Sequence, residues 1–320
     1  MRISTTFMFQ QQTKSISQTQ VDWLAVGERL SSGKRVVYPS DDPIATSQAL
    51  SIQQNQRTQQ RFGMAQQFAQ TTMGAEAAVF SSLTDNIHAA ISDVIYGATG
   101  TLNDEDRQSV AVKLEGVRNQ LLTLANTQDS SGRYLFAGYN TAQPPFIKEN
   151  GGVVYQGGEQ PIVQQVDTQR VMTLSHTGKQ VFLSAPPNPK LEPDGTLGDT
   201  DLFSVLDNAI AALKTPMADA DDSTRAALQE AMNSANRGLN NSLNNILALQ
   251  SENGTQLAEL ASLNTLSASQ NLIAESQLSQ LVDADITQTI SEYYMKQTAL
   301  QASYTAFTQM SKLSLFQLNK

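Results

Sequence analysis

Few residues of this chain are of a type that performs acid–base, nucleophilic or metal chemistry. None of its 320 residues is cysteine, which excludes disulfides, zinc ribbons, iron–sulfur clusters and a thiol nucleophile. The two histidines, His88 and His176, have no motif partner in the sequence. We therefore expect no metal site, no cofactor and no histidine base, and we predict that the chain is not an enzyme.

Two groups of acidic residues could also bind a metal ion or act in catalysis. The segment from Asp194 to Asp201 lacks the ligand order and the final glutamate of an EF-hand, which favours a solvated turn over a calcium site. Asp283 and Asp285 are two positions apart, and residues at that spacing do not share a helix face. A carboxylate pair for catalysis is therefore disfavoured, and we expect helix capping or subunit contacts instead.

The overall composition excludes two further classes of protein. The net charge is -9, which argues against a nucleic-acid binder because such proteins carry a basic surface. No run of 18 apolar residues is present, so we expect no membrane insertion. The first 20 residues lack the basic start and apolar centre of a secretory signal. Charged residues make up 16% of the chain, below the usual value of about 25%, which is typical of a structural protein rich in Gln, Ser, Thr and Asn.

The elements at the two ends of the chain are predicted to be helices with thin apolar stripes. The stripe within residues 1–38, here called the N-terminal seam, has the spacing of a coiled coil: Phe9, Ile16, Trp23, Val26 and Leu30. The stripe near the other end, here called the C-terminal seam, repeats in the same way: Ile286, Ile290, Tyr293, Leu300, Tyr304 and Phe307. Helices with such thin stripes are not stable alone, so each requires a partner.

The simplest arrangement pairs the two seams with each other. Each buried anchor then contributes roughly 1.5–3 kcal/mol. The stripes are equally compatible with the ordinary core of a helical bundle, and the pattern alone does not separate these two interpretations.

Long helices are predicted between the seams. Gly33 interrupts the N-terminal helix, and Asp42 is predicted to cap a helix that begins at Pro43. Asn103 or Asp104 is predicted to cap the next helix. Helical periodicity covers four segments: 44–97, 104–124, 202–213 and 223–282.

A small β-rich insert is predicted over about 140–190. Turn residues there separate four runs of β-forming residues: 153–155, 162–166, 171–174 and 181–183. The sequence therefore predicts a mainly α protein with a small β domain. Its predicted architecture is a rod with a terminal coiled coil, a long-helix bundle and a β-rich insert.

Three domains follow from this layout. The terminal coiled coil comprises 1–42 with 284–320, the helical rod 43–139 with 201–283, and the β-rich part with its linker 140–200. Such a chain has much lateral surface, which favours sideways packing against copies of itself.

Short motifs near both seams resemble those of a known family. Residues 30–35 (Leu-Ser-Ser-Gly-Lys-Arg) with 40–43 (Ser-Asp-Asp-Pro) resemble the N-terminal signature of flagellins. Residues 281–285 (Leu-Val-Asp-Ala-Asp) with 300–302 (Leu-Gln-Ala) resemble the C-terminal signature. The middle, 132–139 with 144–146, and the ending, 314–320, resemble hook-associated proteins of the hook–filament junction, a branch of the flagellin superfamily.

This resemblance implies a structural subunit of the bacterial flagellum. Members leave the cell unfolded through the flagellar type III system without a cleaved signal, and they form a ring layer between hook and filament. The implied partners are identical subunits, the adjacent hook-associated protein on the hook side, flagellin on the filament side and a cytoplasmic export chaperone. The implied chaperone-binding residues belong to the C-terminal seam: Ile286, Ile290, Tyr293, Leu300 and Phe307.

Two alternatives remain open. A filament flagellin shares the terminal signatures, but residues 34–39 and the short insert depart from the filament pattern. A small-molecule binding module is the other alternative, with Tyr139, Phe146 and Tyr155 lining a pocket, although a β-domain core is the favoured interpretation of these aromatics.

Overall fold

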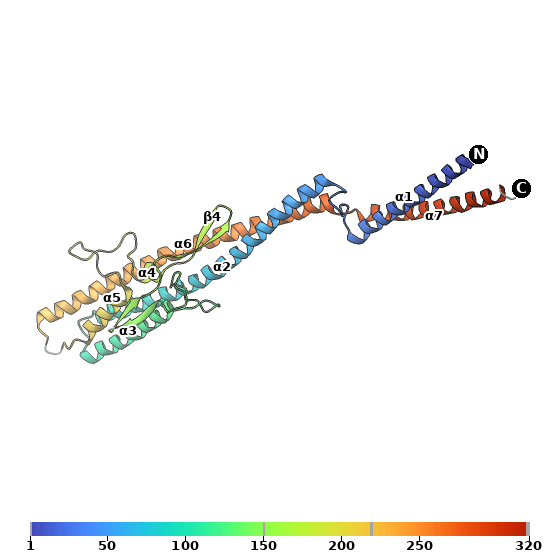
Figure 1. Ribbon diagram of the computed structural model, residues 1–320. Helices are drawn as coiled ribbons and strands as arrows, with labels where there is room; N and C mark the ends of the chain where they lie inside the picture. Colours follow the sequence, from blue (N-terminus) through green and yellow to red (C-terminus); the bar gives the residue numbers. More distant parts are fainter. Residues whose placement is uncertain (1, 150, 218–219, 318–320) are drawn as a thin grey trace. The chain divides into compact units, whose positions relative to one another are not determined.

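The computed structural model describes residues 2–149, 151–217 and 220–317, which form two compact units (Figure 1). The terminal unit comprises the described residues of Met1–Gln60 and Ser267–Lys320, and the central unit those of Arg61–Leu266. Two long helices belong to both units: α2 (Pro43–Gly97) and α6 (Asp222–Val282). The division into three domains predicted from the sequence stays a prediction.

In the terminal unit, the two ends of the chain lie side by side (Figure 1). Helix α1 (Arg2–Ser32) packs along α7 (Ile286–Gln317), with Phe9 against Phe307 at 5.9 Å between ring centroids. Gly33 ends α1 with a φ of +69°, a conformation that glycine adopts without steric cost. The predicted interruption at this residue is confirmed.

The connection between α1 and α2 is fixed by hydrogen bonds to the chain between α6 and α7. The Gly33 carbonyl accepts from the Ala284 amide at 2.9 Å, and the Arg35 amide donates to the Val282 carbonyl at 2.7 Å. Asp42 accepts from the Ala45 amide at 3.0 Å, which confirms the predicted cap of α2. The two connections of the terminal unit therefore support each other.

The central unit holds the main hydrophobic core. Three residues of the α2 stripe at seven-residue spacing are buried in it: Phe80, Ile87 and Val94. The fourth, Met73, is buried in a smaller neighbouring cluster. Helices α3 (Asp104–Ala125) and α5 (Leu202–Lys214) pack beside each other, and Asn103 caps α3 by accepting from the Asp106 amide. The predicted helices in this unit are confirmed within a few residues.

Two antiparallel hairpins make up the β structure. Strand β1 (Phe146–Glu149) pairs with β2 (Gly152–Tyr155), and β3 (Ile162–Asp167) pairs with β4 (Arg170–Ser175). The strand predicted at 181–183 is wrong, because this segment lies mostly in helix α4 (Gly178–Phe182). Thr177 and Gln180 form a capping box there, and its Thr-x-x-Gln spacing starts a helix where we had predicted a turn and a strand. The fold class, mainly α with a small β part, is confirmed.

Candidate assembly surface

The contact between α1 and α7 is a coiled-coil seam with alternating three- and four-residue spacing. On α1 the buried and half-buried positions of the seam are Phe9, Gln12, Ile16, Thr19, Trp23, Val26 and Leu30. On α7 they are Thr289, Tyr293, Lys296, Leu300, Ser303, Phe307 and Met310. Both series continue over several heptads, as expected for helices that pack along their whole length.

The N-terminal seam lies where the sequence predicted it. Ile16 and Val26 are buried, Leu30 is half-buried, and Trp23 packs on Tyr293 with 5.6 Å between ring centroids. The Tyr293 ring also lies beside Gly27, where an added Cβ would be in van der Waals contact with it at 3.4 Å. Leu300 and Phe307 of α7 are also half-buried, and Phe307 packs on Phe9.

Three residues of the predicted C-terminal seam lie elsewhere. Ile286, Ile290 and Tyr304 are 46%, 39% and 47% exposed, so they do not fill the seam between α1 and α7 of one chain. Relative to the seam of α7 they lie on one flank of the helix, because 286, 290 and 304 are offset from 289, 293, 300 and 307 by about a sixth of a turn at about 100° per residue. We call these three residues the α7 flank.

Polar residues that the hydrophobic pattern missed complete the seam. Thr289 is buried, and Lys296 donates to Asp22 across the seam at 2.9 Å. This hydrogen bond, with a second from Gln18, lowers the pKa of Asp22. Arg29 and Glu292 form a further pair at 4.0 Å. The signal that reveals these positions is the alternation of four- and three-residue steps that starts at Thr289, and it is visible only when polar residues are counted as seam positions.

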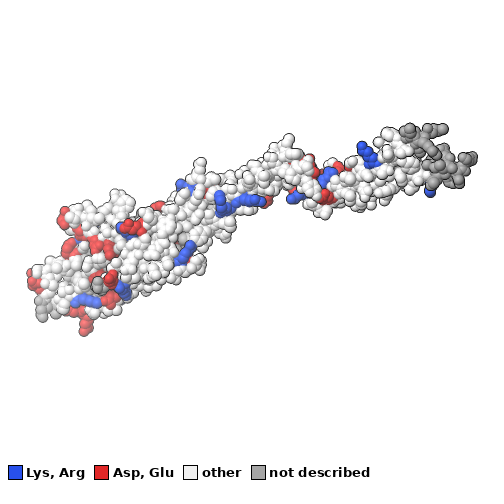
Figure 2. All heavy atoms as spheres, in the orientation of Figure 1, with Lys and Arg blue, Asp and Glu red and all other residues white. Residues whose placement is uncertain are grey.

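Further apolar residues on both helices are exposed. Val21 and Leu24 of α1 are 59% and 56% exposed, and Tyr294 and Met295 of α7 are 62% and 64% exposed. Charged residues lie next to them in the sequence, among them Asp22 and Lys296, but on the face drawn in Figure 2 most of the surface of these helices is uncharged. Exposed apolar side chains of this size, where they gather, are typical of sites of association with another protein.

The charge of the chain is distributed unevenly between the units. The sequence of the terminal unit has nine basic and eight acidic residues, a net charge of +1, whereas that of the central unit has 12 basic and 22 acidic residues, a net charge of -10. The net charge of the terminal unit is therefore close to zero, and the negative charge of the chain belongs to the central unit.

The acidic residues considered in the sequence have structural roles. Asp285 accepts from the Gln288 amide at 3.1 Å and caps α7, as expected, while Asp283 is exposed. Asp194 accepts from Thr196 within its turn, and Asp201 caps α5 by accepting from the Phe203 amide at 2.8 Å. Within the described ranges, no group of three or more acidic or histidine side chains is placed to hold a metal ion.

The aromatic residues of the β-rich part do not converge on a ligand pocket. Phe146 is buried against Tyr155, Phe182 and Phe203, with ring centroids 5.1–5.5 Å apart. The Tyr155 hydroxyl donates to backbone carbonyls, whereas Tyr139 is 63% exposed. These contacts place Phe146 and Tyr155 in the core, as the favoured interpretation had it.

Among the helices that the structure describes, none combines the length and apolarity needed to cross a bilayer. His88 is exposed on α2, and His176 is buried beside Glu76, a partner 100 residues away that the sequence did not reveal.

Comparison with known proteins agrees with this geometry. Residues 3–141 match the family described as the bacterial flagellin N-terminal helical region. The paired terminal helices, the long helices and the small β part thus define a structural protein of the flagellin type.

Full-length relatives identify the branch. The chain is 50% identical to flagellar hook-associated protein 3 of Escherichia coli strain K12 and 46% identical to that of Salmonella typhimurium, and each comparison covers all of both chains. The chain therefore belongs to the flagellar hook-associated protein 3 family, which is a structural component of the flagellum outside the cell.

A solved structure shows the same fold. The flagellar junction protein FlgL of Legionella pneumophila superposes with a TM-score of 0.61 at 20% identity, over 74% of this chain and all of that one.

Proposed function

We propose that this chain is the adaptor subunit that joins the flagellar hook to the filament, and that it acts by assembly and not by catalysis. The observation that carries the proposal is the incomplete burial of the terminal unit. Helices α1 and α7 pair through one seam, while the α7 flank and the outer faces of both helices keep large apolar side chains in solvent. Family membership adds that the relatives are named for association with the hook.

In this proposal identical subunits form a ring layer through their terminal units. The α7 flank of Ile286, Ile290 and Tyr304 contacts a neighbouring copy, because these residues are exposed in the single chain. The near-neutral charge of the unit supports such contacts. On the hook side the ring meets the adjacent hook-associated protein, and on the filament side it meets flagellin.

Export precedes assembly in this account. The chain passes unfolded through the flagellar type III system with no cleaved signal, and the absence of cysteine keeps disulfides from forming before passage. A cytoplasmic chaperone binds Ile286, Ile290, Tyr293, Leu300 and Phe307 before export. The folded chain buries Tyr293, Leu300 and Phe307 partly against α1, so the chaperone and α1 compete for these three residues.

The test compares two substitutions at one seam position. Leu300→Asp places a charge in the seam, whereas Leu300→Met keeps an apolar side chain of similar volume there. We expect Leu300→Asp to leave a folded central unit, measured by circular dichroism, but to abolish the joint in images of hook–filament junctions. Leu300→Met should assemble.

A truncation after residue 282 makes the same test more severe. It should yield a soluble central unit and no joint. A hook and filament still joined by the truncated chain would contradict the proposal.

Polymerisation of the purified chain distinguishes a junction adaptor from a filament subunit. We expect pure monomer not to grow long filaments under conditions in which flagellin does. Long filaments of this chain alone would instead favour a filament subunit.

A further inference from the structure

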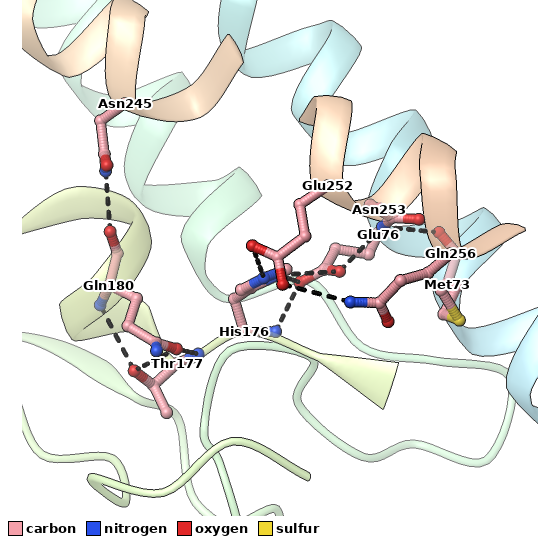
Figure 3. Close-up of polar contacts among 9 residues, drawn as sticks. All are labelled: Met73, Glu76, His176, Thr177, Gln180, Asn245, Glu252, Asn253 and Gln256. Carbon is pink, nitrogen blue, oxygen red and sulfur yellow. Dashed lines mark hydrogen bonds and ion pairs between the residues drawn. The ribbon is translucent and has the colours of Figure 1, made fainter. Parts of the chain in front are cut away.

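The His176 side chain occupies a buried position between two long helices of the central unit. It follows strand β4, and only 4% of its surface is exposed. Glu76 of α2 lies on one side of the ring and Glu252 of α6 on the other (Figure 3). Glu76 is itself 1% exposed, so a carboxylate and an imidazole are buried together away from solvent.

Both ring nitrogens face carboxylates. Nδ1 lies 3.1 and 3.2 Å from the two Glu76 oxygens, and Nε2 lies 3.9 Å from a Glu252 oxygen. The backbone amide of His176 also donates to Glu76 at 2.7 Å, and Asn253 Nδ2 donates to Glu76 at 2.9 Å. Only the protonated imidazolium has a proton on each nitrogen, so the arrangement fits the charged ring.

This cluster joins the β3–β4 hairpin to the helices beneath it. The hairpin has its own small hydrophobic cluster, separate from the main core: Val166, Met172 and Leu174 pack with Ala69, Met73 and Leu260. Gln66 donates to the Val166 carbonyl at 2.9 Å, and Arg170 pairs with Glu259. An element held by so few buried contacts opens locally at lower free energy than the main core does.

We propose that protonated His176 is a latch that holds the β3–β4 hairpin against α2 and α6, and that a rise in pH releases it. Loss of the ring's charge ends its attraction to Glu252 and leaves the buried Glu76 carboxylate without a counter-charge. A buried charge without its partner is costly, and the cost is relieved when the hairpin separates from the helices and water reaches Glu76.

The electrostatic surroundings of the ring support the sign of this effect. Burial lowers the pKa of His176, but the hydrogen bond and charge of Glu76, together with Glu252, outweigh burial, and the pKa is raised. Of the charged groups in the described part of the chain, these two carboxylates face the ring from α2 and α6. The stabilisation of the hairpin by protonated His176 is therefore complete below about pH 6.5, the ordinary pKa of histidine. It is lost as the pH rises through the pKa of His176 in the folded chain.

The full-length chain offers a direct test because it has only two histidines. An NMR titration of the histidine Cε1–H signals follows both, and His88→Gln removes the second signal and assigns the first to His176. We expect His176 to titrate above the ordinary range, and Glu76→Gln to lower its midpoint more than Glu252→Gln does.

Hydrogen exchange then measures the hairpin itself. After correction for the intrinsic pH dependence of exchange, the protection of amides in 162–175 should fall about tenfold for each unit by which the pKa of His176 is raised. Amides of α3 serve as the control region and should keep their protection. His176→Gln should abolish the pH-dependent part of hairpin protection.

Two results would overturn the proposal. One is a His176 midpoint at or below the ordinary range in the unmodified chain. The other is hairpin protection that stays constant while His176 loses its charge. Both measurements are made on the unmodified chain, so they test the latch even if the Glu76→Gln variant fails to fold.

Discussion

The terminal and central units differ in how far each completes its own hydrophobic core. The central unit buries large side chains fully, among them Phe80, Phe136, Phe146, Phe182 and Phe203. The described part of the terminal unit buries five apolar residues, of which two are alanines: Ile16, Val26, Val36, Ala45 and Ala49. The comparison shows that the central unit has an extensive core of its own, whereas the core of the terminal unit is thin over its described residues.

The largest expected difference between the two units comes from truncating one aromatic side chain in each. Phe136→Ala should lower the unfolding free energy of the central unit by about 3–5 kcal/mol, because the ring is fully buried between Phe80 and Phe182. Trp23→Ala should leave that transition unchanged, because Trp23 is only half-buried and packs in the terminal unit. Denaturant unfolding of both variants provides the measurement, and equal losses would refute the distinction.

A matched pair of glycine substitutions sharpens the description of the central core. An added Cβ at Gly178 would lie 2.5 Å from the Phe146 ring and 2.6 Å from the Tyr155 ring, so Gly178→Ala should cost about 1–3 kcal/mol. Gly116 in α3 has no such neighbour within 4 Å, and Gly116→Ala should stabilise by about 0.5–1 kcal/mol. We expect the two substitutions to shift the melting temperature in opposite directions. Two shifts of the same sign would contradict the close packing described around Gly178.

Limited proteolysis of the free monomer tests the terminal unit. We expect early cleavage before about residue 40 and after about residue 285, because α1 and α7 depend on a thin seam with polar members such as Thr289 and Lys296. Mass spectrometry should identify a resistant fragment that contains the central unit. First cleavage inside α3 or α5 would be the contrary result.

The smallest expected effect concerns the cap of α5. Burial raises the pKa of Asp201 and outweighs the hydrogen bonds from the Phe203 and Ser204 amides, which lower it. The folded chain therefore favours the protonated carboxyl, and the stability this provides is present below the ordinary pKa and lost as the pH rises through the folded value.

Asp201→Asn keeps the cap and removes the charge, since Asn and Asp cap helices about equally well. The variant should be slightly more stable than the unmodified chain near neutral pH and equally stable below about pH 3.8, the ordinary value for Asp. Thermal melts across pH check this. A variant less stable at neutral pH would show that the charge strengthens the cap.

Local patterns predicted the helices well because their signals are contained in short stretches of sequence. The caps at Asp42 and Asn103 and the break at Gly33 each depend on residues within a few positions. The strand predicted at 181–183 was wrong although the capping-box signal was present, because the β propensity of Val181 and Phe182 outweighed it in our interpretation.

The assembly surface was predicted only in part. The seven-residue repeat named Tyr293, Leu300 and Phe307, which are half-buried in the structure. The hydrophobic pattern does not distinguish such positions from apolar positions that stay exposed in the single chain. Ile290 and Tyr304 were therefore predicted to lie in the seam because they are apolar or aromatic. Thr289 and Lys296, which do lie in the seam, were not predicted because they are polar. The contact of Glu76 with His176 joins residues 100 positions apart and leaves no local signal.

Hydrogen exchange of the free, full-length monomer tests the central claim most directly, because it reads both units in one experiment. We predict that amides of α1 and α7 exchange with little protection, and that those of α3 and α5 exchange only when the central unit unfolds. In assembled hook–filament junctions, α1 and α7 should become protected. Equal protection of α1, α7, α3 and α5 in the free monomer would contradict the account, because the terminal unit would then be complete without its neighbours.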